Sequence, residues 1–148
     1  MTILAGTECE ADPAILALPE GSHPVTRVRT LLVDDSGEFL NSAADFLSGS
    51  RDIEIVGRAQ SGREAIRLAA ELFPDLVLVD ISMPEINGIE LTRRLKQGAS
   101  PPKVVILTFH VNAAYRLAAE LAGADAFVAK TDLVDTLLPT VLSLFKTE

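Results

Sequence analysis

The sequence predicts a single α/β domain in which a parallel sheet is covered by helices on both faces. Short apolar runs of strand length alternate five times with segments whose apolar residues recur at helical spacing. Parallel strands need crossover connections, and a helix after every strand supplies them. The 148-residue chain is 48% hydrophobic but only 5% aromatic, so we expect a core of Ala, Val, Leu and Ile between layers of helix and sheet.

The elements follow one another in a regular order from Val28 onward. Five runs are expected to be strands: Val28–Val33, Ile53–Ala59, Leu76–Val79, Val104–Leu107 and Ala126–Ala129. Five segments are expected to be helices: Phe39–Leu47, Ala65–Leu72, Ile89–Leu95, Ala113–Ala122 and Leu133–Phe145. The second strand ends in Arg58-Ala59-Gln60, without an acid, and this favours an edge position away from any site.

Residues 1–27 differ from the rest of the chain, and the folded domain is expected to cover residues 28–147. The first segment has three prolines and little periodicity, so we expect a mobile extension with a short helical turn at Ala14–Leu18. Its Cys9 is the one cysteine of the chain and cannot form an internal disulfide, which favours a reducing cytoplasm.

The composition excludes several classes of protein. A net charge of −8 and the absence of any basic run argue against direct binding of nucleic acid by this domain. The apolar stretches are short and interrupted by charges, so we expect no membrane span. The N-terminus lacks a basic start followed by an apolar run and does not resemble a secretory signal.

Polar side chains stand at the carboxyl ends of four of the five predicted strands. The first strand ends in Asp34-Asp35, the third in Asp80 and the fourth in Thr108, and Lys130 follows the fifth. Ligands of open α/β sheets bind beyond the carboxyl ends of the strands. We therefore expect these side chains to converge on one crevice.

Three carboxylates against one lysine give this crevice an excess of negative charge. Two like charges about 4–5 Å apart repel by roughly 3–4 kcal/mol at an effective dielectric constant near 20. Either one carboxylate is protonated or a divalent cation binds, and oxygen donors favour Mg²⁺, or Mn²⁺ in its place. A carboxylate beside a metal, a lysine and a hydroxyl is equipped for phosphoryl transfer.

Four motifs, in their order and spacing, resemble the response-regulator receiver family over about residues 27–147. They are Val33-Asp34-Asp35, Leu78–Pro84 with Asn87-Gly88, Ile106-Leu107-Thr108, and Gly123–Lys130. The resemblance implies a flavodoxin-like (CheY-like) doubly wound sheet with strand order 2-1-3-4-5 and five helices. Met83-Pro84 and Lys130–Leu133 look most like receivers of the NarL/FixJ type.

The resemblance also implies a role for the acidic residues. Asp80 looks like the phosphoryl acceptor and also like a ligand of the metal. Asp35 looks like a direct ligand of the metal, Asp34 a ligand through water, and the backbone carbonyl of Ser82 a further ligand.

A second set of implied roles concerns the phosphoryl group and the response to it. Lys130 would pair with the phosphoryl group and Thr108 would hydrogen-bond to it. Phe127 occupies the position of an aromatic switch that moves inward with Thr108. The readout would be the face formed by the last two predicted helices and the strand between them.

The resemblance therefore implies a signalling switch that a sensor histidine kinase or a phosphotransfer protein phosphorylates. Such a receiver is not a conventional enzyme, although it assists its own phosphotransfer and dephosphorylation. One alternative is a pseudo-receiver that takes no phosphate and serves as a dimerisation or docking module. Another is a Mg²⁺-dependent phosphatase or phosphotransferase on a similar sheet, for which about 120 structured residues leave little room for a substrate cap.

Several residues also have a simpler interpretation. Asp35 and Ser36 are common helix-capping types, and Lys130 is compatible with a surface position. Phe127 fits either a core residue or the switch. The helix Leu133–Phe145 is apolar on more than one side, which fits a core helix with exposed leucines or, as we favour, a homodimer or partner surface.

Three features depart from the family. Phe109 is bulky where receivers commonly carry a small residue, and we expect its ring to restrict access to Asp80. Ser82 and His110 flank the approach of a hydrolytic water and are expected to tune the lifetime of the phosphoryl group. The chain stops at Glu148, so either this is a single-domain receiver or a DNA-binding output domain has been removed.

Overall fold

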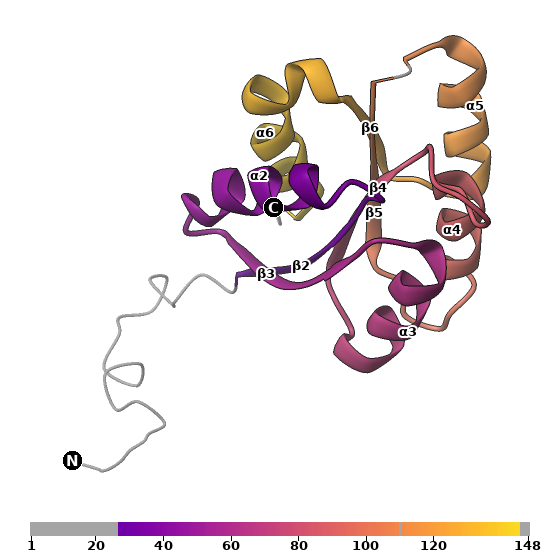
Figure 1. Cartoon of the computed structure of the whole chain (residues 1–148), viewed down its shortest axis with the longest axis horizontal. Coiled ribbons are helices and arrows are strands. Elements are labelled where there is room, and N and C mark those ends of the chain that lie inside the picture. The colour runs from indigo at the N-terminus through magenta and orange to yellow at the C-terminus, as the bar shows by residue number, and fades with distance from the viewer. Residues whose placement is uncertain (1–26, 110, 146–148) are drawn as a thin grey trace.

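A five-stranded parallel sheet forms the middle layer of the protein in the computed structural model, which describes residues 27–109 and 111–145 (Figure 1). Its strands are β2 (Val28–Val33), β3 (Ile53–Ala59), β4 (Leu76–Asp80), β5 (Lys103–Thr108) and β6 (Ala126–Ala129). Their order in the sheet is β3-β2-β4-β5-β6, and every neighbouring pair is parallel. This is the expected order 2-1-3-4-5 in chain numbering, with β3 at an edge. The expectations for Cys9, the Ala14–Leu18 turn and His110 lie outside the described residues.

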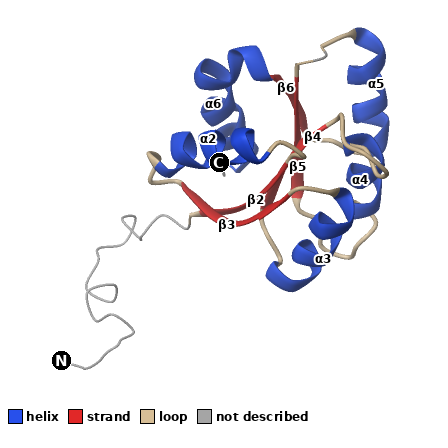
Figure 2. Ribbon diagram, viewed as in Figure 1, coloured by secondary structure: helices blue, strands red, loops and turns tan. Residues whose placement is uncertain are grey.

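Helices cover both faces of the sheet. They are α2 (Gly37–Ser48), α3 (Gly62–Leu72), α4 (Gly88–Leu95), α5 (Ala113–Ala122) and α6 (Leu133–Phe145), the last preceded by the short 3₁₀ helix η1 (Lys130–Asp132). Helices α2 and α6 lie on one face and α3, α4 and α5 on the other (Figure 2).

The first four of these helices begin at a Ser or Asn that caps the helix. The side chains of Ser36, Ser61, Asn87 and Asn112 each accept a hydrogen bond from the backbone N–H three residues later. Such caps satisfy N–H groups that have no partner within the helix. Helices α2 and α3 therefore begin two and three residues before the first apolar residue from which we predicted them.

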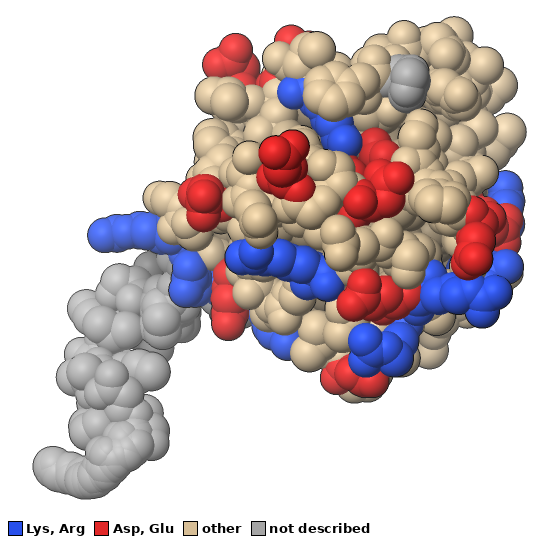
Figure 3. Space-filling view, in the orientation of Figure 1, with Lys and Arg blue, Asp and Glu red and all other residues tan. Residues whose placement is uncertain are grey.

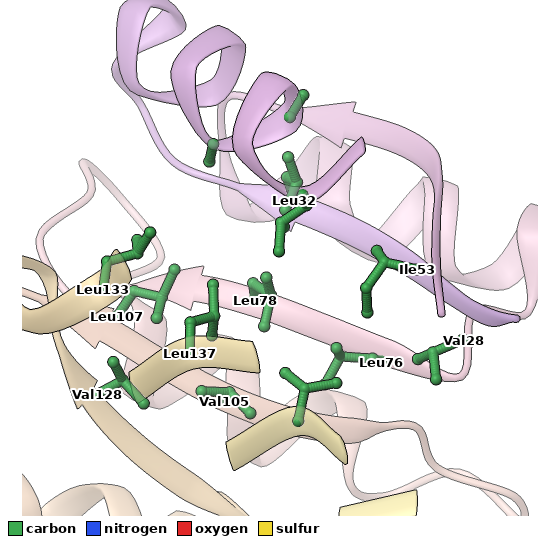
Figure 4. Close-up of a cluster of buried hydrophobic side chains, with 14 of the residues drawn as sticks. Val28, Leu32, Ile53, Leu76, Leu78, Val105, Leu107, Val128, Leu133 and Leu137 are labelled. Carbon is green, nitrogen blue, oxygen red and sulfur yellow. The ribbon is translucent and has the colours of Figure 1, made fainter. Parts of the chain in front are cut away.

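Alternate residues of each strand belong to two separate hydrophobic clusters, one on each face of the sheet. In β2, Leu32 belongs to the cluster under α2 and α6, which Figure 4 shows, whereas Leu31 and Val33 belong to the cluster under α3, α4 and α5. Successive side chains of a strand point to opposite faces, so a strand covered on both faces is apolar throughout. This explains the uninterrupted apolar runs Leu76–Val79 and Val104–Leu107 of the central strands.

The register of the sheet brings the ends of the strands to one edge. Val33 of β2 lies beside Val79 of β4, so the residues that follow, Asp34 and Asp80, are level with each other. Thr108 at the end of β5 lies beside the last residue of β6. The polar residues at the strand ends therefore lie close together because the apolar residues before them are in register in neighbouring parallel strands.

The last helix is only partly buried, as its two apolar sides predicted. Leu133, Leu137 and Val141 of α6 lie in the core, whereas Val134 is 68% exposed and Leu142 40% exposed. A homodimer through this surface stays a prediction. Among the described residues, no helix has the length and apolar character needed to cross a membrane.

Candidate functional site

A buried lysine joins two buried aspartates at the carboxyl edge of the sheet. Lys130 Nζ lies 2.6 Å from Asp34 Oδ2 and 3.2 Å from Asp80 Oδ1. The three side chains are only 5%, 3% and 8% exposed, respectively. A surface position for Lys130, the simpler interpretation of the sequence, is therefore wrong.

The loop after β2 is fixed by a chain of hydrogen bonds that begins at the site. Asp34 Oδ1 accepts the backbone N–H of Ser36 at 2.9 Å, and Ser36 Oγ accepts the backbone N–H of Phe39 at 3.1 Å. The capping interpretation is thus correct for Ser36, whereas Asp35 between them is exposed and free of that task.

The three carboxylates form a cluster that suits a hard divalent cation. One oxygen from each of Asp34, Asp35 and Asp80 lies within 4.8 Å of the other two. Acidic side chains gather in Figure 3 where β2 and β4 end in Figure 1. Carboxylate oxygens at this separation, with no nitrogen or sulfur donor among them, fit Mg²⁺ or Mn²⁺.

The surroundings of Asp80 disfavour its charge. Burial raises the pKa of the Asp80 carboxyl above its ordinary value, and the neighbouring carboxylates of Asp34 and Asp35 raise it further. The ammonium of Lys130 acts in the opposite direction but does not cancel these effects. The excess negative charge predicted from the sequence is therefore present, and a bound cation would offset it.

The Asn87-Gly88 motif supports the backbone of Asp80. A Cβ atom on Gly88 would lie 2.2 Å from the carbonyl oxygen of Asp80, so a side chain at this position would overlap the strand end. The backbone N–H of Gly88 donates to the carbonyl of Ile81 at 2.9 Å, while Asn87 caps α4. The start of α4 is thus packed directly behind the candidate acceptor.

Two residues assigned to the response lie on the adjoining strands. Thr108 is fully buried at the end of β5. Phe127 of β6 is half-buried against the cluster under α3, α4 and α5, and the guanidinium carbon of Arg116 lies 4.8 Å from its ring centroid. Phe127 is therefore neither a fully buried core residue nor a free surface ring, and its switching stays a prediction.

Two of the three residues expected to control access, Phe109 and Ser82, are exposed. Phe109 is 64% exposed, and its ring centroid lies 5.1 Å from Lys130 Nζ. Ser82 is exposed in the loop after β4. His110, the third of these residues, belongs to the part of the chain that is not described.

The structure adds one residue, Phe39, for which we predicted no role in the site from the sequence. The ring centroid of Phe39 lies 4.0 Å from Lys130 Nζ. We had assigned Phe39 only to the apolar side of its helix. Its place in the first turn of the helix that follows Asp34-Asp35 was the available signal.

Comparison with known proteins gives a consistent family. Residues 30–141 match the model of the response regulator receiver domain. The chain is 38% identical over 104 residues to the transcriptional regulatory protein LiaR of Bacillus subtilis, covering 70% of this chain and 49% of that protein. It spans about half the length of the curated relatives it matches.

Solved structures agree with the sequence relatives. The signal receiver domain of the putative response regulator NarL from Mycobacterium tuberculosis is 28% identical, with a TM-score of 0.70, over 76% of this chain and 94% of that one. The response regulator domain of Thermotoga maritima CheB is 28% identical, with a TM-score of 0.76, over 83% of this chain and 99% of that one.

Proposed function

The chain belongs to the response-regulator receiver family, and we propose that it accepts a phosphoryl group on Asp80 and acts as a two-state signalling switch. The observation that carries this proposal is Lys130, buried between Asp34 and Asp80 within a cluster of three carboxylates. The donor would be a sensor histidine kinase or a phosphotransfer protein.

The residues of the crevice support a direct displacement at phosphorus. A carboxylate oxygen of Asp80 attacks the phosphorus atom, the bond from phosphorus to the donor breaks, and the donor keeps the electron pair. The ammonium of Lys130 then pairs with a phosphoryl oxygen, and the hydroxyl of Thr108 hydrogen-bonds to another. Hydrolysis follows when water attacks the same phosphorus and the Asp80 carboxylate is released.

The acidic cluster would hold the divalent cation that this chemistry requires. Asp35 and Asp80 would bind it directly, Asp34 through water, and the backbone carbonyl of Ser82 would add a further oxygen. When bound, Mg²⁺ or Mn²⁺ supplies positive charge that neutralises the transferring phosphoryl oxygens.

We propose that the response passes from Thr108 to Phe127 and so to the face formed by α5, β6 and α6. A hydroxyl drawn toward the phosphoryl group opens space into which the half-buried ring of Phe127 can move. The switch would act on a partner, on a second copy of the chain, or on an output domain in the cytoplasm. LiaR is a transcriptional regulatory protein, so control of transcription is our proposed output.

Phe109 is proposed to slow access to Asp80, because its ring lies across the same ammonium that would receive the phosphoryl group. Phe109→Ala is expected to increase the rate of labelling by acetyl phosphate, and an unchanged rate would contradict the idea. Ser82 and His110 are proposed to tune the lifetime of the product.

A pseudo-receiver that only docks or dimerises is the second candidate, and the intact site disfavours it. The acid pair, the acceptor and the lysine are all present: Lys130 contacts Asp34 and Asp80, and an oxygen of Asp35 lies within 4.8 Å of both carboxylates. A module without phosphoryl chemistry has no need of a buried, excess-negative cluster that raises the pKa of Asp80.

Intact-mass measurement separates these candidates. The protein is incubated with Mg²⁺ and acetyl phosphate, beside Asp80→Asn as the control that keeps the shape of the side chain. We expect one added phosphoryl group on the wild type and none on the variant. No adduct on either protein would indicate the pseudo-receiver, and steady release of phosphate from many phosphate esters would indicate a phosphatase.

A further inference from the structure

We propose that Phe39 is a positioning residue for Lys130, holding its ammonium against Asp34 and Asp80 by a cation–π contact. Phe109 is the second ring on the same ammonium. This inference rests on the proposed phosphorylation of Asp80, and it adds a residue to which neither the family motifs nor the sequence pattern assigned a role in the site.

The geometry around the ammonium group carries the inference. Lys130 Nζ lies 4.0 Å from the ring centroid of Phe39 and 5.1 Å from that of Phe109. Both distances are within the roughly 6 Å at which a cation is attracted to an aromatic face. The Lys130 side chain is only 5% exposed, so water competes little and the contact with the nearer ring is strong.

Lysine needs such a guide more than most residues. Its ammonium is a point charge at the end of a flexible four-carbon chain, without the fixed geometry of an arginine. The carboxylates of Asp34 and Asp80 attract it, but both are expected to engage a cation or a phosphoryl group during the reaction. A ring that takes no part in that exchange can keep the ammonium in place throughout.

The charge of the crevice explains why a ring suits this task. A further carboxylate beside Lys130 would also hold the ammonium, but it would add negative charge to a crevice in which three carboxylates already lie within 4.8 Å of one another. An aromatic face attracts a cation through its quadrupole and carries no net charge. Phe39 therefore holds the lysine without adding negative charge to the crevice.

The position of Phe39 is itself fixed from within the site. Its backbone N–H donates to Ser36 Oγ, and the backbone N–H of Ser36 donates to Asp34 Oδ1. Asp34, which pairs with Lys130, thus also fixes the start of α2, the helix that carries the Phe39 ring. The half-buried ring of Phe39 packs in addition against the core under α2 and α6.

The test compares the initial rate of labelling by acetyl phosphate in full-chain variants, measured by intact mass at fixed Mg²⁺. Phe39→Leu keeps apolar bulk but removes the aromatic face, and Phe39→Tyr restores the face. Phe46→Leu is the matched control, because Phe46 is a partly buried ring on the same helix that packs against the core. We expect Phe39→Leu to label about three- to tenfold more slowly, the loss of one cation–π contact, and the other two variants to label at the wild-type rate.

A second readout is independent of phosphorylation. The ring current of Phe39 should shift the ε-methylene proton resonances of Lys130 upfield in the unphosphorylated protein. Phe39→Leu should remove that shift, and Phe39→Tyr should keep it. This signal would not respond to a loss of stability alone.

The outcomes separate this inference from the proposed function. If the wild type takes up no phosphoryl group, the proposed function fails, and the role of Phe39 in it fails as well. If the wild type is labelled and Phe39→Leu is labelled equally fast, only the inference about Phe39 is overturned. The same holds if Phe39→Tyr is as slow as Phe39→Leu, or if the methylene shift does not depend on the ring.

Discussion

Two regions of this protein contain ion pairs of almost the same length in opposite surroundings. In the crevice, Lys130 Nζ lies 3.2 Å from Asp80 Oδ1, and the side chains are 5% and 8% exposed. Over α3 and α4, where Figure 3 shows both signs of charge interspersed, Arg63 Nε lies 3.0 Å from Glu85 Oε1, with side chains 77% and 68% exposed. The distance alone would rank the two pairs as equals.

The surrounding medium makes them different. Two unit charges about 3 Å apart interact by roughly 5 kcal/mol at an effective dielectric constant near 20, but by only about 1.4 kcal/mol in bulk water. Salt also screens an exposed pair far more than a buried one. The crevice pair therefore holds charges that are costly to separate, whereas the exposed pair contributes little to stability.

The acids of the two regions respond in opposite directions. Burial, and then the neighbouring carboxylates, raise the pKa of Asp80 despite its contact with Lys130. On the exposed side of α4, the hydrogen bond from Arg94 holds the pKa of Glu90 below its ordinary value, with help from Arg93. The raised pKa of Asp80 beside two other carboxylates is typical of a site that binds a cation or a reacting group. The lowered pKa of Glu90, which two arginines already neutralise, is not.

The largest expected effect is the removal of the buried cation. Lys130→Met should lower the free energy of unfolding by about 3–5 kcal/mol without divalent ions, because the buried carboxylates of Asp34 and Asp80 lose their counterion. Urea denaturation followed by circular dichroism measures this. Added Mg²⁺ should recover part of the loss. A loss below about 1 kcal/mol would mean that the ion pairs of Lys130 contribute no more to stability than an exposed pair does.

The backbone behind the crevice should be nearly as sensitive. In Gly88→Ala the new Cβ would lie 2.2 Å from the carbonyl oxygen of Asp80. We expect a loss of about 3 kcal/mol in the free energy of unfolding, because a strand end or the start of α4 must move. Gly98→Ala is the matched control: its Cβ would meet nothing within 4 Å, and its effect should stay within about 0.5 kcal/mol. Equal effects at both glycines would contradict the close packing.

A smaller effect of opposite sign is expected at the acceptor itself. The pKa of Asp80 in the folded protein is above the ordinary value of 3.8, so its charge costs stability. That cost grows as the pH rises from about 3.8 through the raised pKa and is then constant. Asp80→Asn should therefore stabilise the protein at pH 7, and the gain should vanish as the pH falls below the ordinary value of 3.8.

Urea denaturation of wild type and Asp80→Asn across this pH range is the measurement. Asp45→Asn on the exposed side of α2 is the control and should change little at any pH. A gain at Asp80→Asn that does not depend on pH would remove titration of Asp80 as its cause.

The smallest effect is expected on the exposed side of the comparison. Arg63→Ala breaks the pair with Glu85 and should change the free energy of unfolding by at most about 0.5–1 kcal/mol, less in high salt. A loss approaching that of Lys130→Met would show that exposure does not separate the two regions.

The strand ends of the site could be predicted from the sequence, but the contacts made there could not. Each of Asp34, Asp80 and Thr108 directly follows or ends an apolar run, and parallel register then brings them together without further information. Asp34 was expected to act mainly through water, and nothing in the sequence indicated that its carboxylate meets Lys130 at 2.6 Å.

Aromatic residues were the hardest to interpret for a physical reason. Phe39 fits the apolar spacing of its helix, so a core role already explained it, and its contact with Lys130 joins residues 91 positions apart. Phe127 similarly meets Arg116, which helical spacing places on α5 without indicating its partner. Cation–π contacts leave no periodic trace, because any aromatic and any cation can form them.

The most direct test of the central claim identifies which residue accepts the phosphoryl group. The protein is labelled with acetyl phosphate and Mg²⁺ and then reduced with borohydride, which converts a phosphorylated aspartate to homoserine. Peptide mass spectrometry should find homoserine at position 80 and at no other aspartate, and none without acetyl phosphate. Homoserine at position 34 or 35 and not at position 80 would contradict the account. So would a protein that gains no mass on labelling and contains no homoserine after reduction.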